Sequence, residues 1–146
     1  MCIREGGRMS EYQKTKTEVN QFLDRVKRLI TYDGKVTINN QTWANGRVNK
    51  TLKYMTETGI TMQDVCRVIK ELEVCNYCYT ADDRNEKYPN EQIWVFGITK
   101  ILIDKEESLY IKLKIRIIKE ELLLIMSFHP ESPIVENLKL KFPYKD

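Results

Sequence analysis

The segment Leu109–Ile118 alternates apolar residues with residues that carry a phenol or a cation. Because successive side chains of a β-strand point to opposite faces, the alternation predicts one apolar face and one polar face. The polar face carries Tyr110, Lys112, Lys114 and Arg116. The only histidine of the chain, His129, follows shortly afterwards. Cations hold phosphates, and an imidazole moves protons near neutral pH, so these residue types suit phosphodiester chemistry on RNA.

The next β-rich segment, Leu122–His129, is expected to pair with this strand as an antiparallel hairpin. The side chains expected in the core are Leu122, Leu124, Met126 and Phe128, and those expected on the polar face are Leu123, Ile125, Ser127 and His129. A slip by one residue would bury the histidine among aliphatic side chains. A two-residue turn at 119–120 places Tyr110 opposite His129, and a turn one residue later places Lys112 there. Both registers bring a phenol, an imidazole and an ammonium within reach of one phosphate.

Alternating charge on an exposed strand also has a simpler explanation. Lysine and arginine on one face keep a sheet soluble and discourage aggregation at its edges. The same face would also serve a non-catalytic RNA-binding module, or a protein-interaction domain that pairs with an acidic partner. The hairpin alone therefore indicates an exposed cationic face without naming a function.

The elements that must position the hairpin fall into two groups along the chain. Apolar residues recur at helical spacing in three segments, at about 11–32, 46–58 and 61–72. Residues 35–38 are a candidate short strand, and residues 73–92 have loop composition. After that the period changes to two, which predicts an antiparallel meander over Ile93–Ile103, Leu109–Ile118 and Leu122–His129. We therefore expect an α+β domain with N-terminal helices packed on a C-terminal antiparallel sheet.

The composition bounds the class of protein. The chain has 146 residues, of which 42% are hydrophobic and 31% charged, as in a single globular domain. No apolar run approaches the roughly 18 residues of a transmembrane helix, and the first residues do not read as a secretion signal. We therefore expect a cytoplasmic protein with no membrane partner. A net charge of +3 does not by itself indicate nucleic-acid binding.

Four cysteines raise the question of a metal site, because Cys75 and Cys78 form a C-x-x-C motif. A structural zinc site takes four ligands, usually from two such pairs, and no second C-x-x-C motif is present. The motif also lacks the βαβ context of a thioredoxin-like redox site. We therefore expect free thiols, no metal and no cofactor.

Four short motifs follow one another between about Gly59 and His129. They are Gly59-Ile60-Thr61, Ile93-Trp94-Val95-Phe96-Gly97, Leu109-Tyr110-Ile111-Lys112 and Met126-Ser127-Phe128-His129. In their order and spacing, the segment from about Gly59 to His129 resembles the MqsR family of toxin endoribonucleases. Phe22-Leu23 in the first predicted helix is similar to the opening helix of that family.

The resemblance implies a RelE-like RNase fold and a type II toxin that cleaves mRNA without a metal and is neutralised by a cognate antitoxin. It also implies that Tyr110 is a functional tyrosine. Our hypothesis is that it cleaves single-stranded mRNA by attack of the 2′-hydroxyl on the adjacent phosphate. Three positions depart from the family's pattern: His129 stands where the best-known members have a lysine, a residue near Tyr79 replaces another lysine, and Val95 replaces a glutamine. His129 is then the expected acid or base, and Arg84 in the preceding loop the expected phosphate contact.

These observations combine into one set of expectations. The toxin-like domain spans residues 10–129, after an N-terminal tail of residues 1–9 and before a C-terminal extension of residues 130–146, which is expected as an edge strand or a docking segment. The expected catalytic residues are His129, Tyr110 and Lys112, and the expected RNA contacts are Arg84, Lys114 and Arg116. The expected partners are mRNA and a cognate antitoxin protein.

Overall fold

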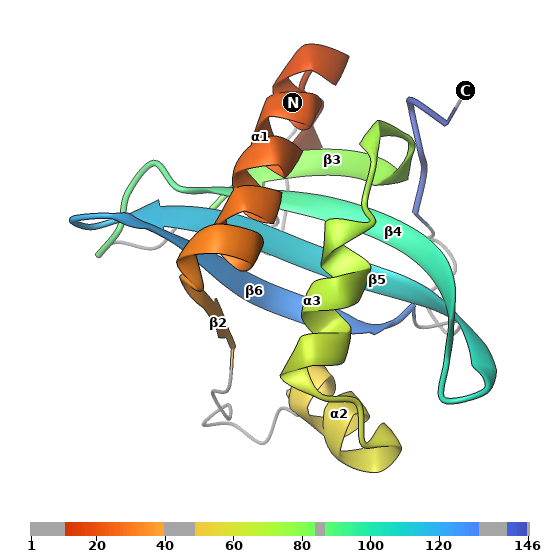
Figure 1. The fold of residues 1–146 in the computed structure, drawn as a ribbon. Helices are drawn as coiled ribbons and strands as arrows, with labels where there is room; N and C mark the ends of the chain where they lie inside the picture. Colours follow the sequence, from red (N-terminus) through yellow and green to blue (C-terminus); the bar gives the residue numbers. More distant parts are fainter. Residues whose placement is uncertain (1–10, 40–48, 84–86, 132–139, 146) are drawn as a thin grey trace.

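The computed structural model describes residues 11–39, 49–83, 87–131 and 140–145 (Figure 1). Within these residues a six-stranded sheet has the order β1-β3-β4-β5-β6-β2, and the helices cover one of its faces. The strands are β1 Glu11–Tyr12, β2 Val36–Ile38, β3 Tyr77–Asp82, β4 Gln92–Leu102, β5 Lys105–Ile117 and β6 Glu121–Pro130. The helices are α1 Lys16–Arg28, α2 Lys50–Thr58 and α3 Met62–Lys70, with short helical turns at Leu29–Asp33 and Val74–Asn76. The predicted α+β class, with N-terminal helices packed on a sheet, is confirmed, and the sheet is antiparallel except for the pairing of β2 with β6.

Local signals set the ends of the helices. Thr15 and Glu18 form a capping box at the start of α1, and Thr61 and Asp64 form another at the start of α3. Gly59 ends α2 in the left-handed conformation, with φ of 78°, which a glycine adopts without steric cost. These caps lie near the predicted boundaries, although the first helix begins later than predicted because β1 precedes it.

The main core lies between the helices and the sheet face that they cover. The apolar stripe of α1 is fully buried there, and Phe22 stacks on Trp94 of β4 with 4.1 Å between ring centroids. Alternate residues of β5 enter the same core, namely Leu109, Ile111 and Leu113, each with no exposed surface. The apolar face predicted for β5 is therefore the face that carries the helices.

The β5–β6 hairpin departs from the predicted register at one point. Ile117 pairs with Glu121, so the connecting loop has three residues rather than the predicted two. Farther along, Lys112 pairs with Ser127 but Leu113 pairs with Ile125, which leaves one extra residue in β6. This bulge restores the pairing of Tyr110 with His129, so one of the two predicted registers holds at the histidine end.

The bulge also reverses the faces of the first half of β6. Leu123 and Ile125 are fully buried in the core, although the sequence pattern placed them on the polar face. The prediction for these two residues is wrong because one inserted residue changes the parity of the strand. Beyond the bulge the predicted faces hold, and Phe128 lies in the core.

Three strands complete the sheet around the predicted meander. β2 runs parallel to β6 and matches the candidate strand at residues 35–38. β3 occupies part of the segment that was predicted to be a loop, and its pairing partners are β4 and the short β1. No helix among the described residues is long and apolar enough to span a membrane.

Candidate active site

The sheet face turned away from the helices, here called the back face, carries the residues with the chemistry of interest. Because Leu109 and Ile111 point into the helix-side core, the intervening Tyr110 points to the back face. A second, smaller apolar cluster of Cys78, Ile93 and Val95 also lies there, and Tyr110 packs against it. The back face is therefore part apolar and part polar.

Tyr110 and His129 are direct neighbours across the β5–β6 ladder. Their ring centroids lie 5.4 Å apart, with the planes tilted by 38°. On the other side of β5, Gly97 of β4 pairs with Tyr110. Gly97, Tyr110 and His129 thus form one rung across three strands, which confirms the predicted neighbourhood of the phenol and the imidazole.

The imidazole of His129 has one nitrogen engaged in a defined hydrogen bond. Its Nδ1 lies 2.9 Å from the carbonyl oxygen of Pro130. Because a carbonyl only accepts, Nδ1 must carry the hydrogen, and in the neutral ring Nε2 is then a hydrogen-bond acceptor. Burial lowers the pKa of His129 below its usual 6.5, the hydrogen bond to Pro130 opposes this shift, and the charges of Lys50 and Lys112 add to it. The neutral form, which accepts a proton, is therefore the dominant form at pH 7.

The phenol of Tyr110 has the opposite character. Burial raises the pKa of Tyr110 above its ordinary value of 10.0, and the neighbouring Tyr79, with which it shares a hydrogen bond, raises it further. Tyr110 therefore keeps its proton at neutral pH. In the sequence, the position near Tyr79 stands out only because the MqsR family has a lysine there. Its contact with Tyr110 depends on the pairing of β3 with β4, which the sequence pattern did not predict.

Lys112 lies on the back face between this pair and the loop after β3. Burial lowers the pKa of Lys112, while the nearby carboxylate of Asp83 acts in the opposite direction. The charge of Lys112 also contributes to the lowered pKa of His129. The three predicted catalytic residues, Lys112, Tyr110 and His129, are therefore brought together.

Lys114 does not face water as predicted. Its side chain is 2% exposed and forms ion pairs with Asp83 and with Glu91, the latter at 2.8 Å between Nζ and Oε1. The two carboxylates come from the segment between β3 and β4, which is distant from Lys114 in the sequence. The prediction that Lys114 extends an exposed cationic track is wrong, because these acids cover and neutralise it.

Arg116 is held in a similar way. Its Nε and Nη2 donate to the two carboxylate oxygens of Glu91 at 2.8 and 2.9 Å, and its guanidinium carbon lies 3.5 Å from the ring centroid of Tyr88. Hydrogen bonds from Arg116 hold the pKa of Glu91 below its usual range. This end of β5 therefore offers little uncompensated positive charge. Arg84, the other predicted RNA contact, lies outside the described residues.

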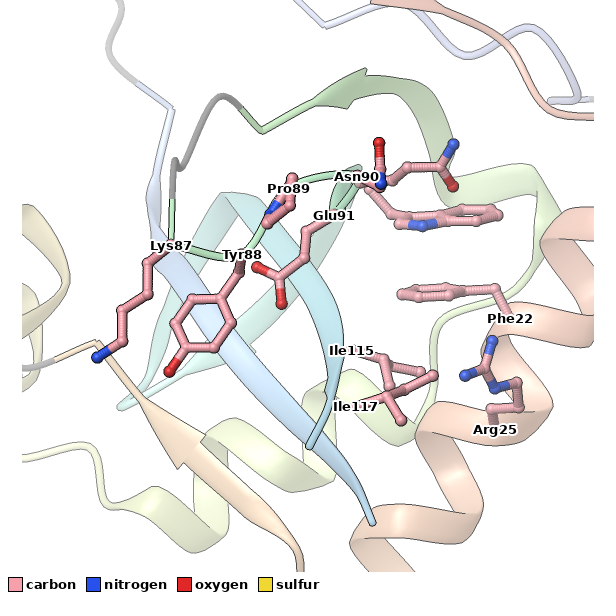
Figure 2. Close-up of a pocket in the computed structure, with 11 residues that line it drawn as sticks. Phe22, Arg25, Lys87, Tyr88, Pro89, Asn90, Glu91, Ile115 and Ile117 are labelled. Atoms are coloured by element: carbon pink, nitrogen blue, oxygen red, sulfur yellow. The ribbon is translucent and has the colours of Figure 1, made fainter. Parts of the chain in front are cut away.

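A pocket of 420 Å³ lies at the same end of β5, between α1 and residues 87–91 (Figure 2). One side of the pocket is lined by Phe22, Arg25, Ile115 and Ile117. The other side is lined by Tyr88 and Glu91. Ile115 is about 17 Å along the strand from Tyr110, at roughly 3.3 Å per residue. The pocket is therefore separate from the Tyr110–His129 pair.

The C-x-x-C motif does not form a reactive site. Cys78 is 2% exposed, and burial raises the pKa of its thiol to about 12, so it is not a thiolate at neutral pH. Cys75 is also a free thiol. In the described part of the chain, no three histidine, cysteine or acidic residues are placed to hold a metal ion together.

The family model described as "Motility quorum-sensing regulator, toxin of MqsA" matches residues 19–130. The chain belongs to the MqsR toxin family. It is accordingly the toxin of a toxin–antitoxin system, and the family implies an antitoxin as its protein partner. A search of curated proteins finds no match to the chain. Both members of the Tyr110–His129 pair lie inside the region that matches the MqsR model, and residues 140–145 lie beyond it.

Proposed function

We propose that this MqsR-family toxin is an endoribonuclease that cleaves single-stranded mRNA in the cytoplasm without a metal ion. The observation that supports this most strongly is the direct pairing of Tyr110 with His129. A phenol that keeps its proton lies beside an imidazole whose Nε2 accepts one. Cleavage by the 2′-hydroxyl of RNA requires both an acid and a base, and no external nucleophile.

The reaction assigns one role to each group. Nε2 of His129 removes the proton of the 2′-hydroxyl, whose oxygen then forms a bond to the adjacent phosphorus. The bond between phosphorus and the 5′-oxygen breaks, and the hydroxyl of Tyr110 supplies a proton to that oxygen. Lys112 stabilises the negative charge that develops on the phosphate. The products are a 2′,3′-cyclic phosphate and a 5′-hydroxyl.

Incubation of the purified toxin with single-stranded RNA in the presence of EDTA tests the proposal. We expect cleavage, with 2′,3′-cyclic phosphate and 5′-hydroxyl ends identified by end labelling. His129→Ala, purified in the same way, is expected to cleave at least about 100-fold more slowly, since loss of a general base typically costs that much or more. The variant also serves as the control for a contaminating nuclease.

Two other outcomes would overturn the proposal. Binding of RNA by the wild type without cleavage would identify a non-catalytic RNA-binding module. No measurable RNA affinity at low salt, where phosphate contacts are strongest, would leave a protein-interaction domain.

The role of Tyr110 is tested with Tyr110→Phe, which removes only the hydroxyl. We expect cleavage to fall by about tenfold or more, with little change in RNA affinity, because proton donation acts in the transition state. Tyr32→Phe is the matched control, since Tyr32 is 81% exposed and lies on the helical turn after α1. An equal loss in both variants would contradict a role for the Tyr110 proton.

A further inference from the structure

Within residues 140–145, here called the C-terminal strap, Leu140 and Phe142 pack on the back face next to the candidate active site. Leu140 and Phe142 lie against the apolar cluster of Cys78, Ile93 and Val95, the same cluster that Tyr110 contacts. The strap therefore shares its packing surface with the phenol to which the proposed function assigns a proton.

Gly97 has no side chain, and this leaves space on β4 for the apolar side chains of the strap. A Cβ atom on Gly97 would lie 2.8 Å from Cδ1 of Leu140 and 2.9 Å from Cζ of Phe142, closer than such atoms approach one another. Glycine inside a strand often marks a place where another segment comes close to the backbone. Leu140 and Phe142 thus occupy the space that a side chain on β4 would otherwise fill.

A second contact fixes the far end of the strap. The hydroxyl of Tyr144 donates to the carbonyl oxygen of Lys14 at 2.6 Å. The ring of Tyr144 stacks on that of Tyr77, with 6.0 Å between centroids. Leu140, Phe142 and Tyr144 therefore hold the strap in place. The residues between them, Lys141 and Pro143, are exposed.

The position of Gly97 sets the distance between the strap and the site. Gly97 pairs with Tyr110, which pairs with His129, and neighbouring strands lie roughly 4.8 Å apart. Gly97, on which the strap packs, is thus one strand from Tyr110 and about 10 Å from the backbone of His129. With its apolar side chains on the sheet, the strap exposes Lys141 to solvent. The cations at the other end of the strand are already paired with acids.

We infer that the C-terminal strap forms one wall of the RNA site and that Lys141 contacts a phosphate of the bound strand. The inference deepens the proposed function, on which it rests. The family match ends at Pro130, so this wall is supplied by residues outside the matched region. The ligand is single-stranded RNA, because the strap adds an exposed cation to the segment that packs at Gly97, one strand from the residue to which the proposed function assigns a proton.

The test measures RNA binding in the His129→Ala background, so that it does not depend on cleavage. The dissociation constant for a single-stranded RNA oligonucleotide is measured over a range of salt concentrations, with and without Lys141→Glu. We expect at least threefold weaker binding and a shallower salt dependence, by roughly 0.7 in the logarithmic slope for one lost phosphate contact. Lys105→Glu, an exposed lysine at the far hairpin, controls for the change in net charge.

A second variant loosens the strap without changing charge. Phe142→Ala is expected to weaken RNA binding and to slow cleavage when His129 is present. Faster cleavage by Phe142→Ala would overturn the inference and identify the strap as a cover over the site. Equal effects of Lys141→Glu and Lys105→Glu would also overturn it. If the wild type does not cleave RNA but Lys141→Glu still weakens RNA binding, the proposed catalysis is rejected. The inference that the strap contacts RNA then stands by itself.

Discussion

Strand β5 presents two halves with the same alternation of side chains but different surroundings. In the first half, Tyr110 and Lys112 lie beside His129 of β6, and burial shifts the pKa of each of these groups. In the second half, Lys114 and Arg116 are bound to acids from the segment between β3 and β4. Equivalent positions on one strand therefore lie in the Tyr110–His129 neighbourhood at one end and in an ion-pair network at the other.

The difference shows that partners, rather than residue type, decide what a cation does. Asp83 and Glu91 turn two cations of the strand into anchors for the segment that precedes β4. A buried cation paired with two carboxylates holds these groups in place, and it has no charge left for a ligand. We therefore expect substitution of Lys114 to lower the stability of the fold and substitution of Lys112 to weaken RNA binding.

The largest effect that separates the two halves is expected for Lys114→Met. Removing the ammonium leaves the carboxylates of Asp83 and Glu91 without this partner in a largely buried site. The free energy of unfolding, measured by urea denaturation, should fall by about 3 kcal/mol. Lys105→Met, an exposed change on the same strand, should cost less than about 0.5 kcal/mol. Equal values for the two variants would show that the buried ion pairs do not stabilise the fold.

A smaller effect distinguishes Lys112 from Arg116 in RNA binding. Lys112→Gln in the His129→Ala background should weaken RNA binding about fivefold, the equivalent of about 1 kcal/mol. Arg116→Gln should change the affinity by less than about twofold, because Glu91 already occupies its guanidinium. Fluorescence anisotropy with a labelled single-stranded oligonucleotide measures both. The reverse order would mean that the paired end of β5, and not the His129 end, contacts the RNA.

Much of the fold can be predicted from local patterns in the sequence. The alternation in β5 sets its two faces, and the capping residues set the starts of α1 and α3. The bulge in β6 is hidden in a run of similar aliphatic residues, Leu122-Leu123-Leu124-Ile125-Met126, where either parity buries apolar side chains. Periodicity therefore placed His129 correctly but assigned Leu123 and Ile125 to the wrong face.

The candidate site was only partly accessible from the sequence for a related reason. The Tyr110–His129 pair depends on a hairpin between neighbouring segments, which a local pattern predicts. The partners of Lys114 and the contact between Tyr79 and Tyr110 depend on β3, whose residues have the composition of a loop. The strap depends on contacts between residues 140–145 and Gly97 that no periodic signal encodes.

The pH dependence of RNA cleavage is the sharpest test of His129 as the general base. If His129 is the general base, kcat/KM should rise with pH as the imidazole loses its proton, through an apparent pKa below 6.5. The rate should then stay level to about pH 8, because the raised pKa of Tyr110 keeps the acid protonated. The residual activity of His129→Ala should lack this rise. A rise centred above pH 6.5, or one that persists in His129→Ala, would contradict the assignment of His129 as the base.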